Sequence, residues 1–184
     1  MATPSNEIVL GSAPPPFSLP DVVSQRTIAL EDVRRGGAVL VMFLCRHCPY
    51  VKHVETEVGR IGRDYAGRLG IVGISANDAA TYPDDAPASL KEQAALAGFT
   101  FPYLYDEGQT VARAYGAVCT PEFFLFDSTP KLTYHGRLDG TRTGREAANG
   151  SDLRAALDAV LAGRALSGVQ HPSVGCSIKW KRSA

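Results

Sequence analysis

The most pronounced pattern in the chain is a run of seven apolar residues from Ala38 to Leu44. Because these residues do not alternate with polar ones, the run predicts a strand that is buried on both faces. From Val51 to Tyr65 the apolar positions recur at helical spacing, with charged residues between them. Pro49 is tolerated in the first turn of a helix, where amide hydrogens lack intrahelical partners. The pattern therefore predicts a strand followed directly by a helix that begins near Pro49.

Shorter patterns of the same kind follow this central pair. Residues 69–75 predict a second buried strand, and residues 122–126 and 131–135 predict an antiparallel hairpin. Parallel strands first and a hairpin at the end predict an α/β fold, in which a central mixed sheet is flanked by helices in three layers. We also expect helices over 86–97 and 109–115 and from Ser151 to Gly163, with Asp85 and Ser151 as caps, and a short strand and turn over 27–33.

The length of 184 residues predicts a single domain (1–184) with an ample core. Residues 1–36, which include a proline-rich stretch, predict an N-terminal extension packed on a core formed by residues 37–163. Residues 164–184 predict a C-terminal tail, and its Trp180 is too apolar to remain in water, so the tail should dock on the core. Within the core, the polar loop 77–87 follows a parallel strand, so it either lines a site or faces solvent.

The charge composition narrows the choice of partners. Lysine and arginine number 19, as do aspartate and glutamate, so the charge balance favours neither nucleic acid nor an anionic membrane as a partner. The sequence holds no apolar stretch of membrane-spanning length, and no basic region followed by an apolar run stands at its start. These features predict a cytoplasmic protein. Four cysteines are too few for a secreted disulfide scaffold and indicate reactive or buried thiols.

Cys45 and Cys48 form a C-x-x-C motif where the predicted strand meets the predicted helix. On a first helical turn the two are near enough to form a disulfide, and the helix dipole stabilises a thiolate there. A helix N-terminus with a nearby imidazole lowers a cysteine pKa to about 3.5–7.5; His47 lies inside the motif, and Arg46 adds a positive charge. The motif thus predicts thiol–disulfide chemistry, with Cys45 as the exposed, low-pKa thiol. A zinc site would need four ligands, and no second C-x-x-C or H-x-x-x-H motif exists, so we expect neither a metal nor a cofactor.

These motifs resemble the thioredoxin superfamily. Cys45-Arg-His-Cys48 at a strand-to-helix junction is followed by Cys119-Thr-Pro121 before a later strand. The extension, with Pro15-Pro-Phe-Ser-Leu-Pro20, resembles the redoxin (AhpC/TSA-like) branch, which includes peroxiredoxins and membrane-tethered thiol reductases. More narrowly, His47-Cys-Pro-Tyr-Val-Lys52 and Gly175-Cys-Ser-Ile-Lys-Trp180 resemble a poorly characterised group of bacterial thioredoxin-like proteins. The resemblance covers almost the whole chain and implies a thioredoxin-like fold.

The resemblance also implies roles for individual residues. It makes Cys45 the attacking cysteine, Cys48 the resolving cysteine, and Pro121 a cis-proline that faces them; from the residues alone, Pro121 simply opens a strand. Thr120 and Pro121 would present their backbone to an extended substrate by strand addition. The substrate would be a disulfide-containing protein or small molecule, and an external thiol reductant would restore the pair.

The sequence departs from thioredoxins at two positions. Leu44 stands where thioredoxins carry a tryptophan, and Val39 stands where they carry the buried aspartate that helps to deprotonate the second cysteine. His47 or a water must therefore do part of that work.

Two other functions remain open. A peroxiredoxin-like thiol peroxidase, an antioxidant enzyme, would use Cys48-Pro49 as its peroxidatic motif, but Cys45 and Val41 then stand where that family has threonine and proline. A thiol-based metal carrier would add His47 and His53 to the cysteines as soft-metal ligands, although we expect His53 in solvent. We favour the oxidoreductase.

Cys119 and Cys176 are possible auxiliary redox thiols. Because side chains alternate along extended chain, Cys119 should face away from the pair if Thr120 faces toward it, and would then be a small buried hydrophobe. Cys176 lies in the tail near Trp180, so a docked tail is expected to place it beside the active site or the 119–121 loop.

Overall fold

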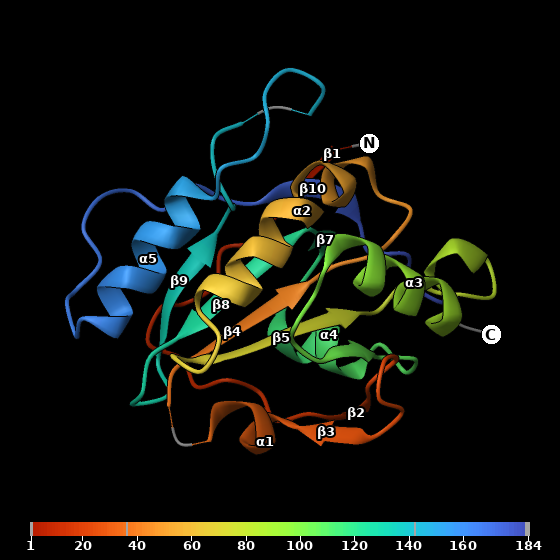
Figure 1. Ribbon diagram of the computed structural model, residues 1–184, viewed down its shortest axis with the longest axis horizontal. Coiled ribbons are helices and arrows are strands. Elements are labelled where there is room, and N and C mark those ends of the chain that lie inside the picture. The colour runs from red at the N-terminus through yellow and green to blue at the C-terminus, as the bar shows by residue number, and fades with distance from the viewer. Residues whose placement is uncertain (1, 36, 142, 183–184) are drawn as a thin grey trace.

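A five-stranded mixed sheet forms the centre of the computed structural model, which describes residues 2–35, 37–141 and 143–182 (Figure 1). Strands β4 (Val39–Phe43), β5 (Gly70–Ser75) and β6 (Tyr103–Tyr105) run parallel, whereas β8 (Glu122–Phe126) is antiparallel to β4 and to β9 (Leu132–Gly136). The prediction of a three-layer α/β fold is confirmed. Strand β6, at the edge of the sheet, was not predicted. In spatial order the strands are β6, β5, β4, β8 and β9.

Strand β4 lies in the middle of this sheet because both of its faces are apolar. Leu40 and Met42 belong to one core cluster, whereas Val39, Val41 and Phe43 belong to the cluster on the other face, and all five are fully buried. This explains why the sequence shows a continuous apolar run and no alternation.

Helices cover both faces of the sheet (Figure 1). The first core cluster lies between the sheet and α2, α3 and α5, and the second between the sheet and α1, α4 and part of the N-terminal extension. Helix α3 ends where Gly98 adopts a left-handed conformation, with φ of 68°. The helices are α1 (Leu30–Arg34), α2 (Pro49–Asp64), α3 (Pro87–Ala97), α4 (Thr110–Tyr115) and α5 (Ser151–Leu161), with a 3₁₀ turn at Pro83–Asp85.

The N-terminal extension and the C-terminal tail pack together on the core. Strands β2 (Ser18–Pro20) and β3 (Thr27–Ala29) form a hairpin. A separate three-stranded sheet joins β1 (Ala2–Pro4) to β10 (Val174–Ser177) and β10 to β7 (Cys119–Thr120). In the tail, the Trp180 ring lies 4.3 Å from the Arg113 guanidinium carbon and packs on the second core cluster. The prediction that the tail docks is confirmed.

Two predicted helix caps are wrong. The N-cap of α3 is Ala86, one residue after Asp85. The N-cap of α5 is Gly150, one residue before Ser151. Asp85 does not cap because it ends the 3₁₀ turn and directs its carboxylate to the backbone of residues 46 and 47. Gly150 adopts a left-handed conformation, and its amide donates to Asp139, so the helix begins at Ser151 instead.

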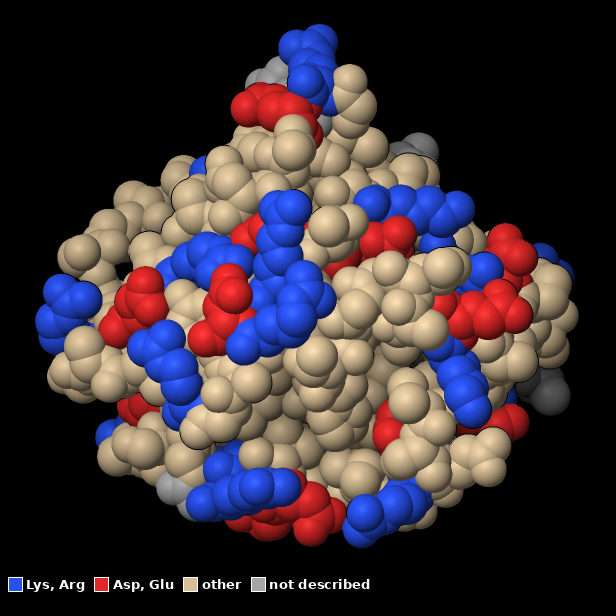
Figure 2. Space-filling view, viewed as in Figure 1, with Lys and Arg blue, Asp and Glu red and all other residues tan. Residues whose placement is uncertain are grey.

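The surface carries both signs of charge. Figure 2 shows lysine and arginine side chains interspersed with aspartate and glutamate over the face that it draws. Within the described residues, every helix is too short or too polar to cross a membrane.

Candidate functional site

The C-x-x-C motif spans the junction between β4 and α2. Cys45 follows the strand by two residues, and Cys48 is the N-cap of the helix, directly before Pro49. Both thiols are fully buried. They meet at Thr120, because Cys45 Sγ lies 3.0 Å from the Thr120 hydroxyl oxygen and Cys48 Sγ lies 3.3 Å from the Thr120 carbonyl oxygen. The Thr120–Pro121 peptide bond is cis. Strand β7 thus brings Thr120 and Pro121 to the two cysteines.

The two thiols have opposite pKa shifts. The Cys48 pKa is lowered to about 5, chiefly because the Cys45 thiol donates a hydrogen bond to it; the Cys176 thiol and the Val51 amide also favour the thiolate. The Cys45 pKa is raised by that same bond to Cys48, then by burial and by the negative charge of Asp85. Burial opposes the thiolate at Cys48, and so does the Thr120 carbonyl, which accepts a hydrogen bond from the protonated thiol, but the hydrogen bonds that favour the thiolate outweigh both.

The prediction that Cys45 is the exposed, low-pKa thiol is therefore wrong. The helix starts at residue 49, so Cys48 holds the N-cap position at the positive end of the helix dipole. Cys45 sits one turn earlier, beside a buried carboxylate that disfavours a second negative charge.

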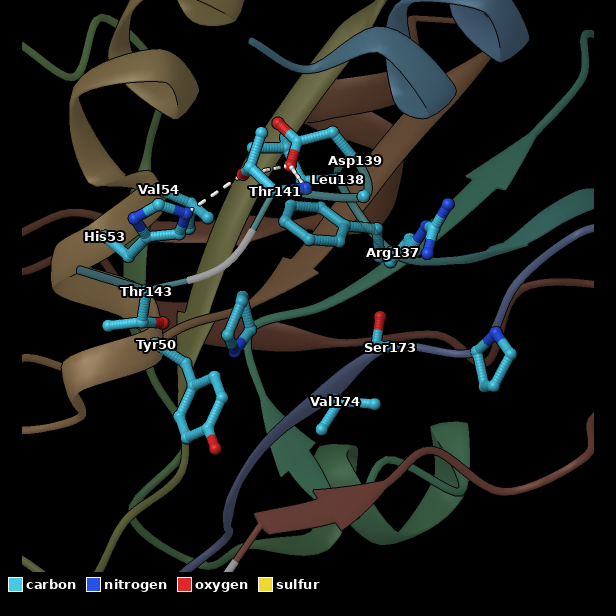
Figure 3. Close-up of a pocket in the computed structure, with 14 residues that line it drawn as sticks. Tyr50, His53, Val54, Arg137, Leu138, Asp139, Thr141, Thr143, Ser173 and Val174 are labelled. Atoms are coloured by element: carbon cyan, nitrogen blue, oxygen red, sulfur yellow. Dashed lines mark hydrogen bonds between the residues drawn. The ribbon is translucent and has the colours of Figure 1, made fainter. Parts of the chain in front are cut away.

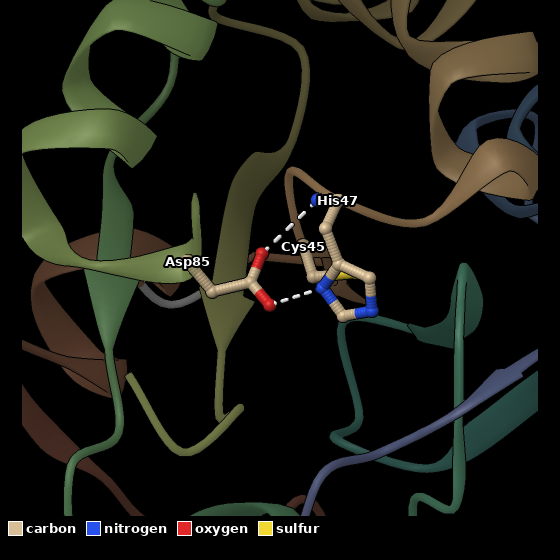
Figure 4. A group of neighbouring side chains, drawn as sticks. All are labelled: Cys45, His47 and Asp85. Atoms are coloured by element: carbon tan, nitrogen blue, oxygen red, sulfur yellow. Dashed lines mark hydrogen bonds and ion pairs between the residues drawn. The ribbon is translucent and has the colours of Figure 1, made fainter. Parts of the chain in front are cut away.

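That carboxylate belongs to Asp85, which organises the motif from outside it (Figure 4). One carboxylate oxygen accepts the backbone amides of Arg46 and His47 at 2.8 and 3.1 Å. The other lies 2.5 Å from His47 Nδ1 and accepts the Asn77 side-chain amide at 2.8 Å. Asp85 is fully buried. In the sequence it was interpreted as a helix cap, and its spacing from the cysteines carries no signal of this role.

The loop 77–87 lines the site, which settles the choice left open by the sequence. Besides Asn77 and Asp85, it supplies Tyr82, whose ring stacks on His47 with the centroids 5.3 Å apart. His47 thus lies between Tyr82 and Asp85, with its imidazole bonded to a carboxylate and not to a thiol.

Arg46 does not serve the thiols. Its guanidinium donates to the Ser89 carbonyl at 2.9 Å and to the Glu92 carboxylate at 2.8 Å, both on α3. The prediction that its charge stabilises the Cys45 thiolate is corrected: its contacts tie the motif to α3. From the same helix, buried Gln93 donates to the Cys45 carbonyl at 3.1 Å, a contact that the sequence did not reveal.

Cys119 faces away from the pair, as the alternation along β7 predicts. Its thiol lies 3.6 Å from a Glu122 carboxylate oxygen, and the same oxygen accepts the Val118 and Cys119 amides. Burial and then the Glu122 charge raise the Cys119 pKa. Glu122 also lies 2.7 Å from His135 Nε2. Cys119 is thus a buried, protonated thiol.

Cys176 is brought to the site by strand pairing. In the antiparallel register of β10 with β7, Cys176 lies opposite Thr120, and its thiol is near enough to Cys48 to help lower the Cys48 pKa. Burial and this contact raise the Cys176 pKa to about 11. The tail therefore lies beside the pair, as expected. It also occupies the edge of β7 at Thr120, where strand addition by a substrate was expected.

Cys45, His47 and Asp85 offer one ligand atom each, all within 4.8 Å of one another. This thiol–imidazole–carboxylate set suits a borderline metal such as zinc. However, both Asp85 oxygens already accept hydrogen bonds, one of them from the imidazole nitrogen that a metal would need. His53 is not part of this group. The structure therefore does not bring His47 and His53 together as ligands, as the metal-carrier hypothesis required.

A cavity of about 470 Å³ has Pro121 in its lining (Figure 3). Tyr50, Pro121 and Val174 line it, each one or two residues from Cys48, Thr120 or Cys176. His53, expected in solvent, is half-buried in its wall and lies 2.9 Å from the Thr141 hydroxyl. Arg137 adds a charged group to the lining.

Comparisons with known proteins found a matching family and similar solved structures. Residues 10–135 match the model of the AhpC/TSA family. An uncharacterized conserved protein from Geobacillus kaustophilus is 47% identical, with a TM-score of 0.96 over 100% of this chain and 98% of that one. A hypothetical protein from Sinorhizobium meliloti 1021 is 41% identical, with a TM-score of 0.95 over 98% of this chain and 100% of that one.

More distant structures share the fold. The C-terminal domain of a putative thiol-disulfide oxidoreductase from Bacteroides thetaiotaomicron is 19% identical, with a TM-score of 0.64 over 84% of this chain and 97% of that one. No curated protein matches the sequence.

Proposed function

Since the chain belongs to the AhpC/TSA family, we propose that it is a thiol–disulfide oxidoreductase whose redox couple is Cys45 and Cys48. One observation carries the proposal: both thiols are directed at Thr120, and their mutual hydrogen bond lowers the pKa of Cys48 while it raises that of Cys45. A thiolate next to a protonated thiol is the arrangement that thiol–disulfide exchange requires.

The reaction begins at Cys48. Its thiolate attacks one sulfur of a substrate disulfide, the substrate S–S bond breaks, and one substrate thiolate leaves. Cys45 then loses its proton to the second substrate sulfur and attacks Cys48, which releases that sulfur as a thiol and leaves a Cys45–Cys48 disulfide. A dithiol reductant restores the pair. These roles are the reverse of those that the resemblance implied, because the lowered pKa belongs to Cys48.

When Cys48 bonds to the substrate, it loses its negative charge, and Cys45 becomes easier to deprotonate for the second step. In the resting site the bond to the Cys48 thiolate is the largest cause of the raised Cys45 pKa. Once Cys48 is bonded to substrate, this cause is absent, and the Thr120 hydroxyl continues to favour a Cys45 thiolate. The resolving thiol therefore becomes more acidic when it is needed.

The cavity beside Pro121 is the proposed position for one half of the disulfide substrate. Tyr50 and Val174 offer apolar contacts there, and His53 and Arg137 offer polar ones. Both thiols are fully buried in the reduced protein, so a substrate disulfide reaches Cys48 only after a local opening of the site.

A thiol peroxidase is the second candidate, and the Cys48 site favours it in one respect. A cysteine with a pKa of about 5 at a helix N-cap, followed by proline, is also suited to attack hydrogen peroxide. Against this function, Cys45 and Val41 still stand where peroxiredoxins have threonine and proline.

The test compares oxidants on the reduced, full-length protein. Reduction of insulin disulfides and of hydrogen peroxide is followed with dithiothreitol as the reductant, for the wild type, Cys45→Ser and Cys48→Ser. The oxidoreductase predicts insulin reduction that depends on both cysteines. Fast consumption of peroxide that survives in Cys45→Ser, without insulin reduction, would favour the peroxidase.

A further inference from the structure

The tail occupies the place next to the thiols where an external strand would bind. Strand β10 pairs with β7 on one side, with Cys176 opposite Thr120, and with β1 on the other, with Cys176 opposite Ala2. The free edge of β7 is thus filled by this chain. Because Thr120 contacts both Cys45 and Cys48, the residue paired with Thr120 also lies at the thiols.

The fit of β10 against β7 is close and well anchored. A Cβ atom at Gly175 would lie 2.0 Å from the Thr120 carbonyl oxygen, so this approach requires glycine. On one side of β10, the Ser173 hydroxyl donates to the Gly136 carbonyl at 2.7 Å. On the other side, the Ile178 amide donates to the Val118 carbonyl at 2.9 Å and the Lys179 amide to Asn77 Oδ1 at 2.8 Å. The position of Cys176 is therefore fixed from both sides.

Cys176 differs from the other three cysteines in its access to solvent. Cys45, Cys48 and Cys119 are buried, whereas Cys176 is half-buried. An external thiol meets Cys176 before it meets the pair. We propose that Cys176 is a third redox thiol, through which an external dithiol reduces the buried Cys45–Cys48 disulfide. This inference rests on the proposed function of the pair.

The proposed steps conserve atoms and electrons. Deprotonated Cys176 attacks the Cys48 sulfur of the Cys45–Cys48 disulfide; that bond breaks, and Cys45 leaves as a thiolate and takes up a proton. The new Cys48–Cys176 disulfide has one half-exposed sulfur. A thiolate of the dithiol attacks Cys176 and releases Cys48 as a thiolate, and the second thiol of the reductant then frees Cys176. The dithiol loses two electrons and two protons, and the pair gains them.

The electrostatics of the oxidised site favour the first step. In the reduced protein, burial is the largest cause of the raised Cys176 pKa, followed by the hydrogen bond and the charge of Cys48, while Lys179 opposes the rise. Formation of the Cys45–Cys48 disulfide removes the Cys48 charge. The Cys176 thiol is then more acidic when the pair is oxidised, which is the state that it must attack.

The first test traps the intermediate. Full-length Cys45→Ser is oxidised mildly with diamide, digested without reductant and mapped by mass spectrometry. We expect Cys48–Cys176 as the main disulfide, both in this variant and in the matched Cys45→Ser/Cys119→Ser control. A map with Cys48–Cys119, or with no disulfide within the chain, would overturn the proposal.

The second test measures whether reduction of the Cys45–Cys48 disulfide passes through Cys176. The oxidised wild type, Cys176→Ser and the control Cys119→Ser are reduced with dithiothreitol, and the free thiols of Cys45 and Cys48 are followed by quenched alkylation. We expect reduction about tenfold slower in Cys176→Ser, because the half-exposed sulfur is missing, and unchanged in Cys119→Ser. Equal rates in all three would show that Cys176 takes no part. Both tests are read from disulfide bonds, so they remain decisive for Cys176 even if the wild type fails to reduce insulin.

Discussion

Two buried carboxylates in this molecule each hold a histidine, but the two pairs differ in their access to solvent. Asp85 lies 2.5 Å from His47 Nδ1, and Glu122 lies 2.7 Å from His135 Nε2. Both carboxylates are fully buried, whereas the His47 side chain is 21% exposed and that of His135 only 5%. The Glu122 pair is thus part of the core, and the Asp85 pair lies at the rim of the site.

The same two carboxylates explain which cysteine carries a negative charge. Asp85 contributes to the raised pKa of Cys45, and Glu122 contributes to the raised pKa of Cys119. The causes that lower the Cys48 pKa are hydrogen-bond donors instead. The comparison teaches that the carboxylates help to keep Cys45 and Cys119 protonated, whereas hydrogen bonds favour the thiolate at Cys48.

The largest effect is expected for Glu122→Gln. Since Glu122 is fully buried and its carboxylate accepts the Val118 and Cys119 amides besides its contact with His135, an amide in its place leaves buried polar groups unpaired and should destabilise the protein by about 3 kcal/mol. Urea unfolding of the reduced protein measures it. Asp152→Asn, which removes the part-exposed partner of Arg137, is the control and should cost less than about 1 kcal/mol. Equal losses in the two variants would contradict a structural role for the Glu122 pair.

Asp85→Asn should change the reactivity of Cys45. Without the Asp85 charge the Cys45 pKa falls, because that charge is one of its causes. The Cys45 thiolate should then be about tenfold more abundant near neutral pH. Alkylation of Cys45, followed by peptide mass spectrometry at pH 7, should be faster by the same factor. Asp152→Asn, which removes a part-exposed carboxylate, serves as the control, and an unchanged or slower rate at Cys45 in Asp85→Asn would contradict the role given to Asp85.

His47→Ala should have a smaller effect in the opposite direction. The imidazole is bonded to Asp85 and partly offsets its charge, so its removal should raise the Cys45 pKa and slow Cys45 alkylation about threefold. His53→Ala, which removes a ring bonded to Thr141, is the control. If Cys45 is alkylated at the same rate in His47→Ala and in His53→Ala, the imidazole of His47 does not act on Cys45 through Asp85.

The parts of this site that lie within one stretch of sequence were predictable. The apolar run and the proline at residue 49 place a strand, a turn and a helix around the two cysteines, and local alternation places Cys119 away from them. Such features depend on periodicity and turn chemistry over a few residues, which a single sequence records.

The parts that depend on contacts between distant segments were not predictable. Nothing local distinguishes Asp85 as a helix cap from Asp85 as the acceptor of the Arg46 and His47 amides. The assignment of the low pKa to Cys45 failed for a related reason, since it required the position of that carboxylate and the exact start of α2. Docking of Trp180 was predicted from its apolar ring, but the register that sets Cys176 opposite Thr120 depends on tertiary packing.

The most direct measurement is the ultraviolet absorbance of thiolate as a function of pH, in the reduced wild type, Cys45→Ser and Cys48→Ser. Below its pKa a cysteine is protonated, and above it the thiolate absorbs. With the Cys48 pKa at about 5, the wild type should gain one thiolate near pH 5. Cys45→Ser should retain this transition, because a serine hydroxyl still donates to Cys48, and Cys48→Ser should lose it. A transition that disappears in Cys45→Ser and persists in Cys48→Ser would contradict the assignment of the thiolate to Cys48.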